Sequence, residues 1–424
     1  MKNNPSAMIG LYGSDKNFQH AFRYVYRMKD AVDGEALSKA VNTAIKRYPY
    51  LAIKLVKHEN EVLHTVVPND RPIVVANRTE PYVMFSEDTN NHMLALLYHD
   101  NNIYLDSSHS FLDGIAACEF AKTVLYYYIT EKYGKAIPSD NIRTLETPMT
   151  EEEVIDPYLY LPPLTEKPVG GARRPDPSFS VAEGGRITER KHTLYELKIN
   201  EDTFVKYSRS HNGTLATMSA AFLAKAILHL HGNVDRPVRI NLIRNLRPVL
   251  GTPKAHHSLV GNILLEYSEK VKDWDMEKLG TISRDMLKFQ TDPSNSLASI
   301  YAKKKQIDSL YAMDHLDAVK SACNQTYTNS GRYVTGVISY VGKIDYGVLA
   351  DYMESISAYV NPSYTNLVIE IGVLNGYLNY SFMQSFSDDV YVKAFAEELR
   401  REGIEAEVGE AQPLLVPRIN VHCI

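Results

Sequence analysis

The feature that most constrains this fold is a proline-rich stretch at about residues 136–190, which divides the chain into two parts. Its prolines are Pro138, Pro148, Pro157, Pro162, Pro163, Pro168, Pro175 and Pro177, with glycine pairs at 170–171 and 184–185. Proline has no backbone N–H to donate, so it interrupts both helices and sheets. We therefore expect a long connection that runs over the surface and holds only short helical pieces.

The part before this connection alternates between strand and helix patterns. Apolar and polar side chains alternate over most of residues 22–28, 51–56 and 103–107, which is typical of strands, and residues 93–99 are a further strand candidate. Helical spacing from Asp33 onward ends at Pro49, and a second helix is expected from Gly114 to about Gly134. We expect an N-terminal domain over 1–170, with the connection beginning near 136.

The part after the connection, 190–424, has the same character. Strands are expected at 192–199, 238–243, 263–267, 333–341, 367–373, 377–382 and 403–408, and helices from 201, from 214, over 276–322 and over 388–401. Asn375-Gly376 between two of these strands is the strongest hairpin signal in the chain. The order of elements predicts an α/β protein built from two parts of similar size.

Composition removes several classes of function. The net charge of −5 gives no sign of a nucleic-acid partner. The sequence contains no run of about 18 apolar residues, so we expect no membrane span. The three cysteines, Cys118, Cys323 and Cys423, are scattered, so we expect no disulfide framework and a reducing, cytoplasmic location.

The segment from Tyr104 to Gly114 is the strongest candidate for chemistry. An alternating strand pattern ends near His109, and Asp113-Gly114 stand just before a helix. Imidazole titrates near neutral pH, which suits a general base. Asp113 alone has a simpler explanation, because aspartate commonly caps a helix N-terminus.

The pattern His-x-x-x-Asp-Gly at residues 109–114 resembles the active-site motif of an acyltransferase superfamily. That superfamily holds chloramphenicol acetyltransferase, plant acyl-CoA-dependent acyltransferases, alcohol acetyltransferases and peptide-synthetase condensation domains. Arg47-Tyr48-Pro49 followed by Leu51 also resembles a segment common in its N-terminal halves. The resemblance implies an α/β fold of two chloramphenicol acetyltransferase-like lobes, with mixed or antiparallel sheets and an active site in a tunnel between them.

The resemblance also implies roles for individual residues. His109 is the general base, and Asp113 points away from it to pair with an arginine of the second lobe. Arg247, in Asn245-Leu246-Arg247-Pro248, is the best candidate for that arginine, and Arg244 is the alternative. Apart from the resemblance, the backbone freedom of glycine leads us to expect that Gly114 serves the turn or the close approach of substrate.

Four further residues are candidates for lining the tunnel: Ser108, Ser339, Gly342 and Asn262. Ser339-Tyr340-Val341-Gly342 resembles a Ser-x-x-Gly segment of the superfamily, although a buried strand followed by a turn glycine explains it equally well. Ser108 stands where condensation domains often have a second histidine. The Asp-Phe-Gly-Trp-Gly segment of the plant enzymes is absent, since the only tryptophan is Trp274.

The activity implied is transfer of an acyl group from an acyl-CoA thioester to an alcohol or amine, closest in type to alcohol acetyltransferases. Acyl-CoA would be a co-substrate, with no bound cofactor or metal, and donor and acceptor would be small molecules. One alternative is a stand-alone condensation enzyme that takes acyl groups from a carrier protein. Another is a non-catalytic relative that binds a partner or ligand.

Other motifs give less support. The chain has no G-x-S-x-G, G-x-G-x-x-G or P-loop pattern, so hydrolase, dinucleotide and nucleoside-triphosphate sites lack a signature. His256-His257 has no carboxylate or cysteine at ligand spacing, and a solvated loop is the expectation there.

Overall fold

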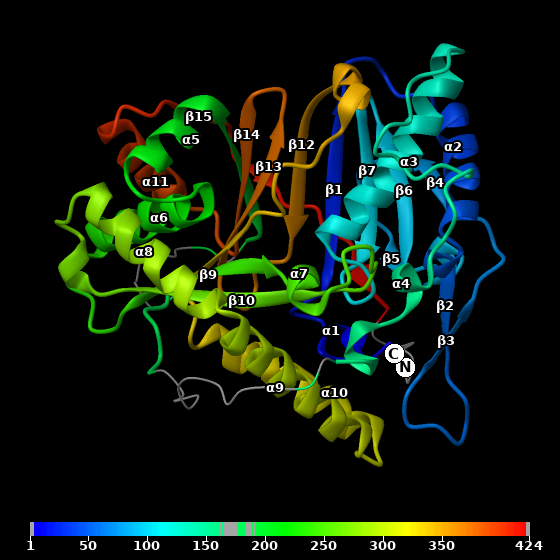
Figure 1. The fold of residues 1–424 in the computed structure, drawn as a ribbon, viewed down its shortest axis with the longest axis horizontal. Coiled ribbons are helices and arrows are strands. Elements are labelled where there is room, and N and C mark those ends of the chain that lie inside the picture. The colour runs from blue at the N-terminus through cyan, green and yellow to red at the C-terminus, as the bar shows by residue number, and fades with distance from the viewer. Residues whose placement is uncertain (1–3, 162, 164–175, 183–188, 190, 421–424) are drawn as a thin grey trace.

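A computed structural model describes residues 4–161, 163, 176–182, 189 and 191–420. Two large sheets stand side by side in it, each with helices on its outer side (Figure 1). Two small two-stranded pairs, β2 (Ile53–Val56) with β3 (Thr65–Pro68) and β5 (Val83–Met84) with β17 (Arg418–Ile419), complete the strand pairing.

The N-terminal lobe is built on a five-stranded sheet in the order β12-β1-β7-β6-β4. Its strands are β1 (Ala21–Met28), β4 (Val75–Asn77), β6 (Leu94–His99), β7 (Asn102–Ser108) and β12 (Met353–Val360). Helices α2 (Gly34–Arg47) and α3 (Gly114–Tyr133) pack together against this sheet (Figure 1). Asp33 caps α2 by accepting from the backbone of Glu35 and Ala36, as its position before the apolar face predicts.

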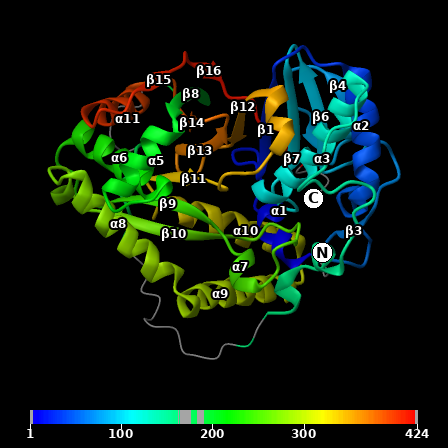
Figure 2. The same ribbon diagram turned by 45° about the horizontal axis from the view of Figure 1, so that its top comes forward.

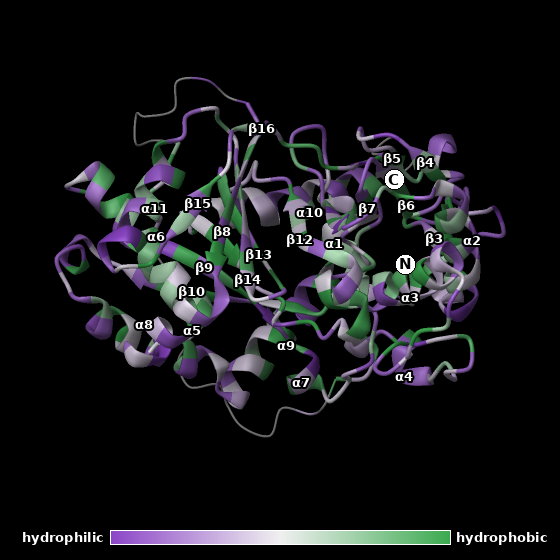
Figure 3. Ribbon diagram, turned by 90° about the horizontal axis from the view of Figure 1, so that it is seen from above, coloured by the Kyte–Doolittle hydropathy of each residue, from purple (hydrophilic) through white to green (hydrophobic). Residues whose placement is uncertain are grey.

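The C-terminal lobe is built on an eight-stranded sheet. Its strands are β8 (Thr193–Asn200), β9 (Val238–Asn245), β10 (Val260–Tyr267), β11 (Gly336–Ser339), β13 (Leu367–Leu374), β14 (Tyr377–Gln384), β15 (Ala406–Val408) and β16 (Gln412–Pro413). Helices α5 (Glu201–Ser210), α6 (Leu215–His231), α8 (Met276–Thr291) and α11 (Val390–Arg401) lie on its outer side (Figure 2). The strands that they cover are strongly hydrophobic (Figure 3).

Elements from the second part of the chain complete the first lobe. Strand β12 pairs antiparallel with β1, so a segment after residue 350 forms the edge of the N-terminal sheet. Helices α9 (Pro293–Tyr311) and α10 (Leu316–Gly331) contribute Ile307 and Cys323 to the core that contains α2 and α3. The division of the chain into 1–170 and 190–424 therefore stays a proposal, since elements from the second part of the chain also belong to the first lobe.

The expected hairpin at residues 367–382 is confirmed. Strands β13 and β14 pair from Leu367↔Gln384 to Leu374↔Tyr377, and Asn375 and Gly376 both have positive φ, at 50° and 79°. Elsewhere the boundaries differ from expectation: β11 covers only Gly336–Ser339, and the single helical region expected over 276–322 is three helices that end at Gly331. No strand was expected at 353–360, where β12 lies.

The proline-rich connection departs from a simple surface crossing. Helix α4 (Glu151–Val154) and a 3₁₀ turn (Pro157–Leu159) are the short helical pieces expected, but Glu153, Asp156 and Tyr158 are fully buried. The expectation of a segment lying only on the surface is therefore wrong for this stretch. Residues 162, 164–175, 183–188 and 190 of the connection, and Cys423 at the other end, lie outside the described residues.

Within the described ranges, no single helix is long and apolar enough to span a membrane; α5 and α6 reach that length and hydropathy only together, across an 84° bend. Nor does the described part of the chain contain three or more histidine, cysteine, aspartate or glutamate side chains grouped to hold a metal ion. Cys118 and Cys323 are buried free thiols.

Candidate active site

His109 lies directly after β7, at the point where that strand leaves the N-terminal sheet. Its backbone N–H donates to the carbonyl of His20 at 2.8 Å, which extends the pairing of β7 with β1 by one residue. Four residues later Asp113 caps α3 through the backbone N–H of Ala116, at 3.1 Å. The strand end and the helix start thus hold the intervening loop at both sides.

The imidazole of His109 is sandwiched between aromatic rings. The ring of His20 stacks on it with centroids 4.7 Å apart and planes 17° apart, and Phe22 meets it edge-on at 5.2 Å. Burial lowers the pKa of His109, an effect that the nearby carbonyls of His109 and Leu112 only partly oppose. The ring is therefore neutral at pH 7, which is the state required of a proton acceptor.

His20 is a residue that the sequence did not single out. Burial lowers its pKa well below the ordinary value, and repulsion from Lys303, and from His109 whenever that ring is protonated, lowers it further. Gly10 in α1 (Met8–Tyr12) makes room for this ring, because a Cβ there would lie 2.3 Å from Nδ1 of His20. A histidine just outside a strand pattern carries no local signal of such stacking, since the contact forms only in the folded sheet.

Asp113 and Arg247 form a bidentate ion pair. Nη1 and Nη2 of Arg247 donate to the two carboxylate oxygens at 2.7 and 2.9 Å, and the backbone N–H of Leu259 adds a third bond at 3.1 Å. With the helix-capping bond to Ala116, the carboxylate accepts four hydrogen bonds. Asp113 and Arg247 are 1% and 2% exposed, so the pair is closed to water.

Arg247 also holds the loop that follows it. Its Nε donates to the carbonyl of Ala255 at 2.8 Å and its Nη2 to that of His257 at 3.0 Å. Arg244 bonds instead to Ser296 and Thr291 near the start of α9. Of the two arginines that the sequence offered for Asp113, the structure brings Arg247 to it.

His256 and His257 are buried, and the solvated loop expected for them is wrong. The ring of His256 bonds to the carbonyl of Glu153 at 2.5 Å, and Nε2 of His257 to that of Val154 at 2.8 Å. Helix α4 of the connection covers this loop and supplies both carbonyls. A contact between residues about 100 positions apart is not readable from the local sequence.

Gly114 lies where two elements approach each other closely. A Cβ at this residue would lie 2.5 Å from the hydroxyl of Tyr24 on β1 and 2.7 Å from Cγ1 of Val341. Val341 belongs to the Ser339–Gly342 segment after β11, so this segment of the C-terminal lobe lies against the start of α3. Gly342 has φ of 91°, a conformation that favours glycine.

The other predicted lining residues lie in different surroundings. Ser108 is fully buried and its hydroxyl has no hydrogen-bond partner among the described residues. Ser339 is 7% exposed at the end of β11. Asn262 is exposed on the edge strand β10, where it accepts from Asn241 at 2.9 Å, two strands away from Ser339.

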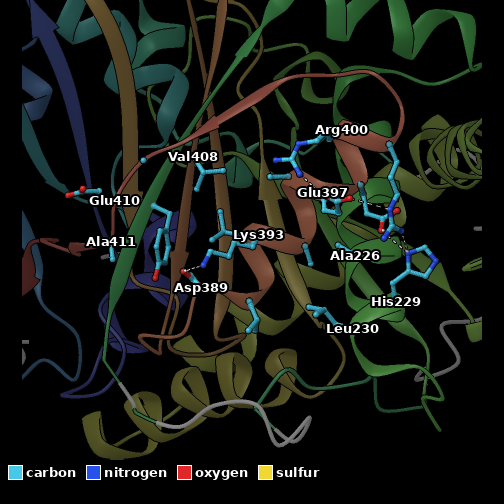
Figure 4. Close-up of a pocket in the computed structure, with 18 residues that line it drawn as sticks. Ala226, His229, Leu230, Asp389, Lys393, Glu397, Arg400, Val408, Glu410 and Ala411 are labelled. Atoms are coloured by element: carbon cyan, nitrogen blue, oxygen red, sulfur yellow. Dashed lines mark hydrogen bonds and ion pairs between the residues drawn. The ribbon is translucent and has the colours of Figure 1, made fainter.

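A cavity of about 930 Å³ lies away from the motif at residues 109–114, on the outer side of the C-terminal lobe (Figure 4). It opens between α6, α11 and the segment after β15, and contains none of the predicted site residues. The charged groups at its rim are largely paired with one another, as in His229–Glu398 and Lys393–Asp389. It gives no reason to move the candidate active site away from His109.

No protein-family model matches this sequence, and no curated protein matches it either. Solved structures do match. TRI101 of F. graminearum, complexed with coenzyme A and deoxynivalenol, aligns with a TM-score of 0.61 at 10% identity, over 95% of this chain and 98% of that one.

Two further solved structures align across nearly the whole chain. Polyketide synthase associated protein 5 from Mycobacterium tuberculosis gives 0.57 at 16% identity, over 89% and 93% of the two chains. A structure for condensation domain-mediated chain release from the enacyloxin polyketide synthase gives 0.52 at 11%, over 92% and 80%. The chain thus has the two-lobed fold of chloramphenicol acetyltransferase-like and condensation-domain proteins, and the fold that the sequence resemblance implies is confirmed.

Proposed function

We propose that this protein is an acyltransferase that moves an acyl group from a thioester to an alcohol or amine, with His109 as the general base. The observation that carries the proposal is the half-buried imidazole at the strand end, stacked on His20, with its loop fixed by Asp113. The fold shared with a protein solved with coenzyme A supports this assignment.

In the proposed reaction His109 removes the proton from the acceptor hydroxyl or amine as that atom attacks the thioester carbonyl carbon. The tetrahedral intermediate then collapses, the carbon–sulfur bond breaks, and the thiolate takes the proton back from His109. An ester or amide and a free thiol result, so no other reactant is needed. A positioned base of this kind contributes about 10²–10⁴-fold to the rate.

Asp113 and Arg247 have a different task in this proposal. Both oxygens of the carboxylate are occupied by Arg247, Leu259 and Ala116. Asp113 is therefore a positioning residue that fixes the loop between His109 and α3. Gly114, Ser108, Ser339 and Gly342 are proposed to shape the space that the substrates enter.

Acyl-CoA is the proposed donor. One of the similar solved structures is a condensation domain, so the experiment also tests the alternative of a carrier-protein-bound donor. It tests as well the alternative of a protein that only binds its ligand. The proposal includes a reducing, cytoplasmic location, because Cys118 and Cys323 are unpaired thiols.

Release of free thiol from a panel of acyl-CoAs, with alcohols and amines as acceptors, tests the proposal. We expect thiol release that depends on both substrates and falls about 10²–10⁴-fold in His109→Ala. Turnover only with a loaded carrier protein would favour the condensation enzyme. No thioester turnover with any donor, or an unchanged rate in His109→Ala, would contradict the mechanism.

A further inference from the structure

A row of polar side chains crosses the C-terminal sheet on the side that faces the other lobe. Register pairing places Ser339 of β11 beside Glu370 of β13, Glu370 beside Ser381 of β14, and Ser381 beside Glu196 of β8. Register partners point to the same face of a sheet. The row shares its face with Val368, which packs with Tyr364 and residues of β12, whereas Ile369 points to the helices on the outer side.

The two carboxylates in this row have different surroundings. Glu196 accepts hydrogen bonds from Ser357 at 2.8 Å and Tyr359 at 3.0 Å, both on β12. Glu370 is half-buried and interacts with the hydroxyl of Ser339, and no cation among the described residues offsets its charge. A half-buried carboxylate without a cation is costly to ionise, so this group is unusual.

Glu370 faces a narrow space between the lobes. It lines a cavity of about 20 Å³, enough for one water-sized group, together with Tyr24, Val341 and Gly342. The two sheets approach closely here, since a Cβ at Gly372 would lie 2.3 Å from the carbonyl oxygen of Ile356 on β12. Strands β12 and β13 stand side by side in Figure 1.

Two tyrosines connect Glu370 with the surroundings of His109. The charge of Glu370 adds to burial in raising the pKa of both Tyr24 and Tyr364. Tyr24 lies against the space beside Gly114 and packs on Phe22, whose ring touches His109. This is one side of the path from the carboxylate to the candidate base.

The other side runs through a cluster of rings. Tyr364 packs on Phe18 and Tyr327, and both of these contact His20, which stacks on His109. Glu370 is therefore bracketed by side chains that reach His109 from two directions. An acceptor with its nucleophile at His109 and its other end at Glu370 would have to lie along these side chains.

We propose that Glu370 binds an ammonium group of the acyl acceptor, so that the acceptor class is a small amino alcohol or diamine. This inference rests on the proposed function. The bound ammonium cannot be the nucleophile, because its nitrogen has no free electron pair. A second group of the acceptor, a hydroxyl or a neutral amine, attacks the thioester and gives its proton to His109. The carbon–sulfur bond then breaks, the thiolate takes the proton from His109, and the acceptor is released as an ester or amide.

The ionisation of Glu370 agrees with this assignment. Burial raises its pKa to about 7, against the partial opposition of Ser339. An ammonium placed beside the carboxyl would favour its charged form and lower that pKa again. Binding of a cationic acceptor should thus weaken as Glu370 becomes protonated below about pH 7, whereas binding of a neutral alcohol should not.

The test compares amino alcohols with unbranched alcohols of matched length, using thiol release from acyl-CoA. In Glu370→Gln we expect KM for the amino alcohol to rise about 10–100-fold, the range of a lost charge-assisted contact, with KM for the matched alcohol changed less than about twofold. Glu196→Gln, which removes a carboxyl from the same face, is the matched control and should not alter the preference. Equal effects of Glu370→Gln on both acceptors would overturn the inference and leave the proposed function standing.

Two further measurements test the same inference: the first needs no turnover, and the second needs no variant. The amino alcohol alone should raise the melting temperature of the wild type, and this stabilisation should be lost in Glu370→Gln. If this holds while no thioester is consumed, the proposed function fails and the cation site stands.

In the wild type, KM for the amino alcohol should rise about tenfold per pH unit below about 7, with no such rise for the alcohol. Parallel pH profiles for the two acceptors would overturn the inference even if Glu370→Gln fails to fold.

Discussion

The carboxylate of Asp113 and the guanidinium of Arg247, 134 positions apart in the chain, form a buried ion pair with N–O distances of 2.7 and 2.9 Å. Asp113 ends the loop that carries His109, and Arg247 begins α7 (Arg247–Leu250) in the C-terminal lobe. The pair thus ties the candidate catalytic loop to the opposite lobe. Its carboxylate is fully engaged, so His109 and Asp113 do not form a catalytic dyad.

Breaking this ion pair should lower the free energy of unfolding of the protein. Asp113→Ala and Arg247→Met each leave a buried partner without its counter-charge, which typically costs about 3–5 kcal/mol. Urea denaturation at pH 7 measures the loss, and the double variant should recover part of it because no lone charge remains. A normally stable and fully active Asp113→Ala protein would contradict this role.

The sequence predicted the local parts of this site and missed the parts that depend on distant packing. His109, Asp113 and Gly114 lie within six consecutive positions at a strand-to-helix corner, so one motif reveals all three. Arg247 was identified because Asn245-Leu246-Arg247 resembles a strand-end segment of the superfamily. Strand β12 was missed: Ser355 and Ser357 interrupt its apolar pattern, and its partner β1 lies more than 300 positions earlier.

The features that the sequence did not reveal share one physical cause. His20, Glu370 and the buried pair His256-His257 have ordinary neighbours in sequence, and what makes each unusual is a ring, a cavity or a carbonyl brought by another element. A half-buried carboxylate such as Glu370 looks like any strand residue until the opposite lobe is in place. Sequence patterns report periodicity along one element, and these features arise between elements.

The rate with a neutral alcohol acceptor should stay high at mildly acidic pH. Burial lowers the pKa of His109 from its ordinary value near 6.5, so the base remains unprotonated down to that pH or below it. The profile of kcat/KM should therefore be flat from pH 8 to about 6.5 and fall at lower pH. A half-maximal rate at pH 7 or above would show that the imidazole is not in the environment described.

His20 should act on the rate through the orientation of His109. In His20→Phe an aromatic ring still packs on the base, and we expect kcat to fall less than about tenfold. In His20→Ala the stacking surface is lost, and kcat should fall further with KM for the acyl donor little changed. If both variants match the wild type in kcat and in the position of the acidic limb of the pH profile, His20 has no positioning role.

A methyl group at Gly114 should be poorly tolerated. In Gly114→Ala the new Cβ would lie 2.5 Å from the Tyr24 hydroxyl and 2.7 Å from Val341, and such overpacking typically costs about 1–3 kcal/mol. Adding Tyr24→Phe and Val341→Ala to this variant removes both clashing atoms and should restore part of the melting temperature. If Gly114→Ala lowers the melting temperature as much in the presence of Tyr24→Phe and Val341→Ala as it does in the wild type, steric contact is not the cause.

The ion pair between Arg47 and Glu153 should make stability depend on acid pH. Burial opposes ionisation of Glu153, but hydrogen bonds from Arg47 and Tyr50 outweigh it and lower its pKa to about 2. A carboxyl with a pKa below its unfolded value of about 4.5 stabilises the fold above that pH, and this contribution, on the order of 3 kcal/mol, is lost as pH falls from about 5 to 2.

Urea denaturation at pH 7, 5 and 3 tests this dependence in the wild type and in Glu153→Gln. The stability difference between the two should be large at pH 7 and should narrow toward pH 3, because below about pH 4.5 the unfolded wild type takes up a proton at Glu153 that the folded protein does not, and the variant has no such group. Glu87→Gln is the matched control: Glu87 pairs with Arg71 on the surface, where water screens the interaction, so its difference should be small at every pH. A constant difference for Glu153→Gln across this range would mean that Arg47 does not hold Glu153 in its ionised form.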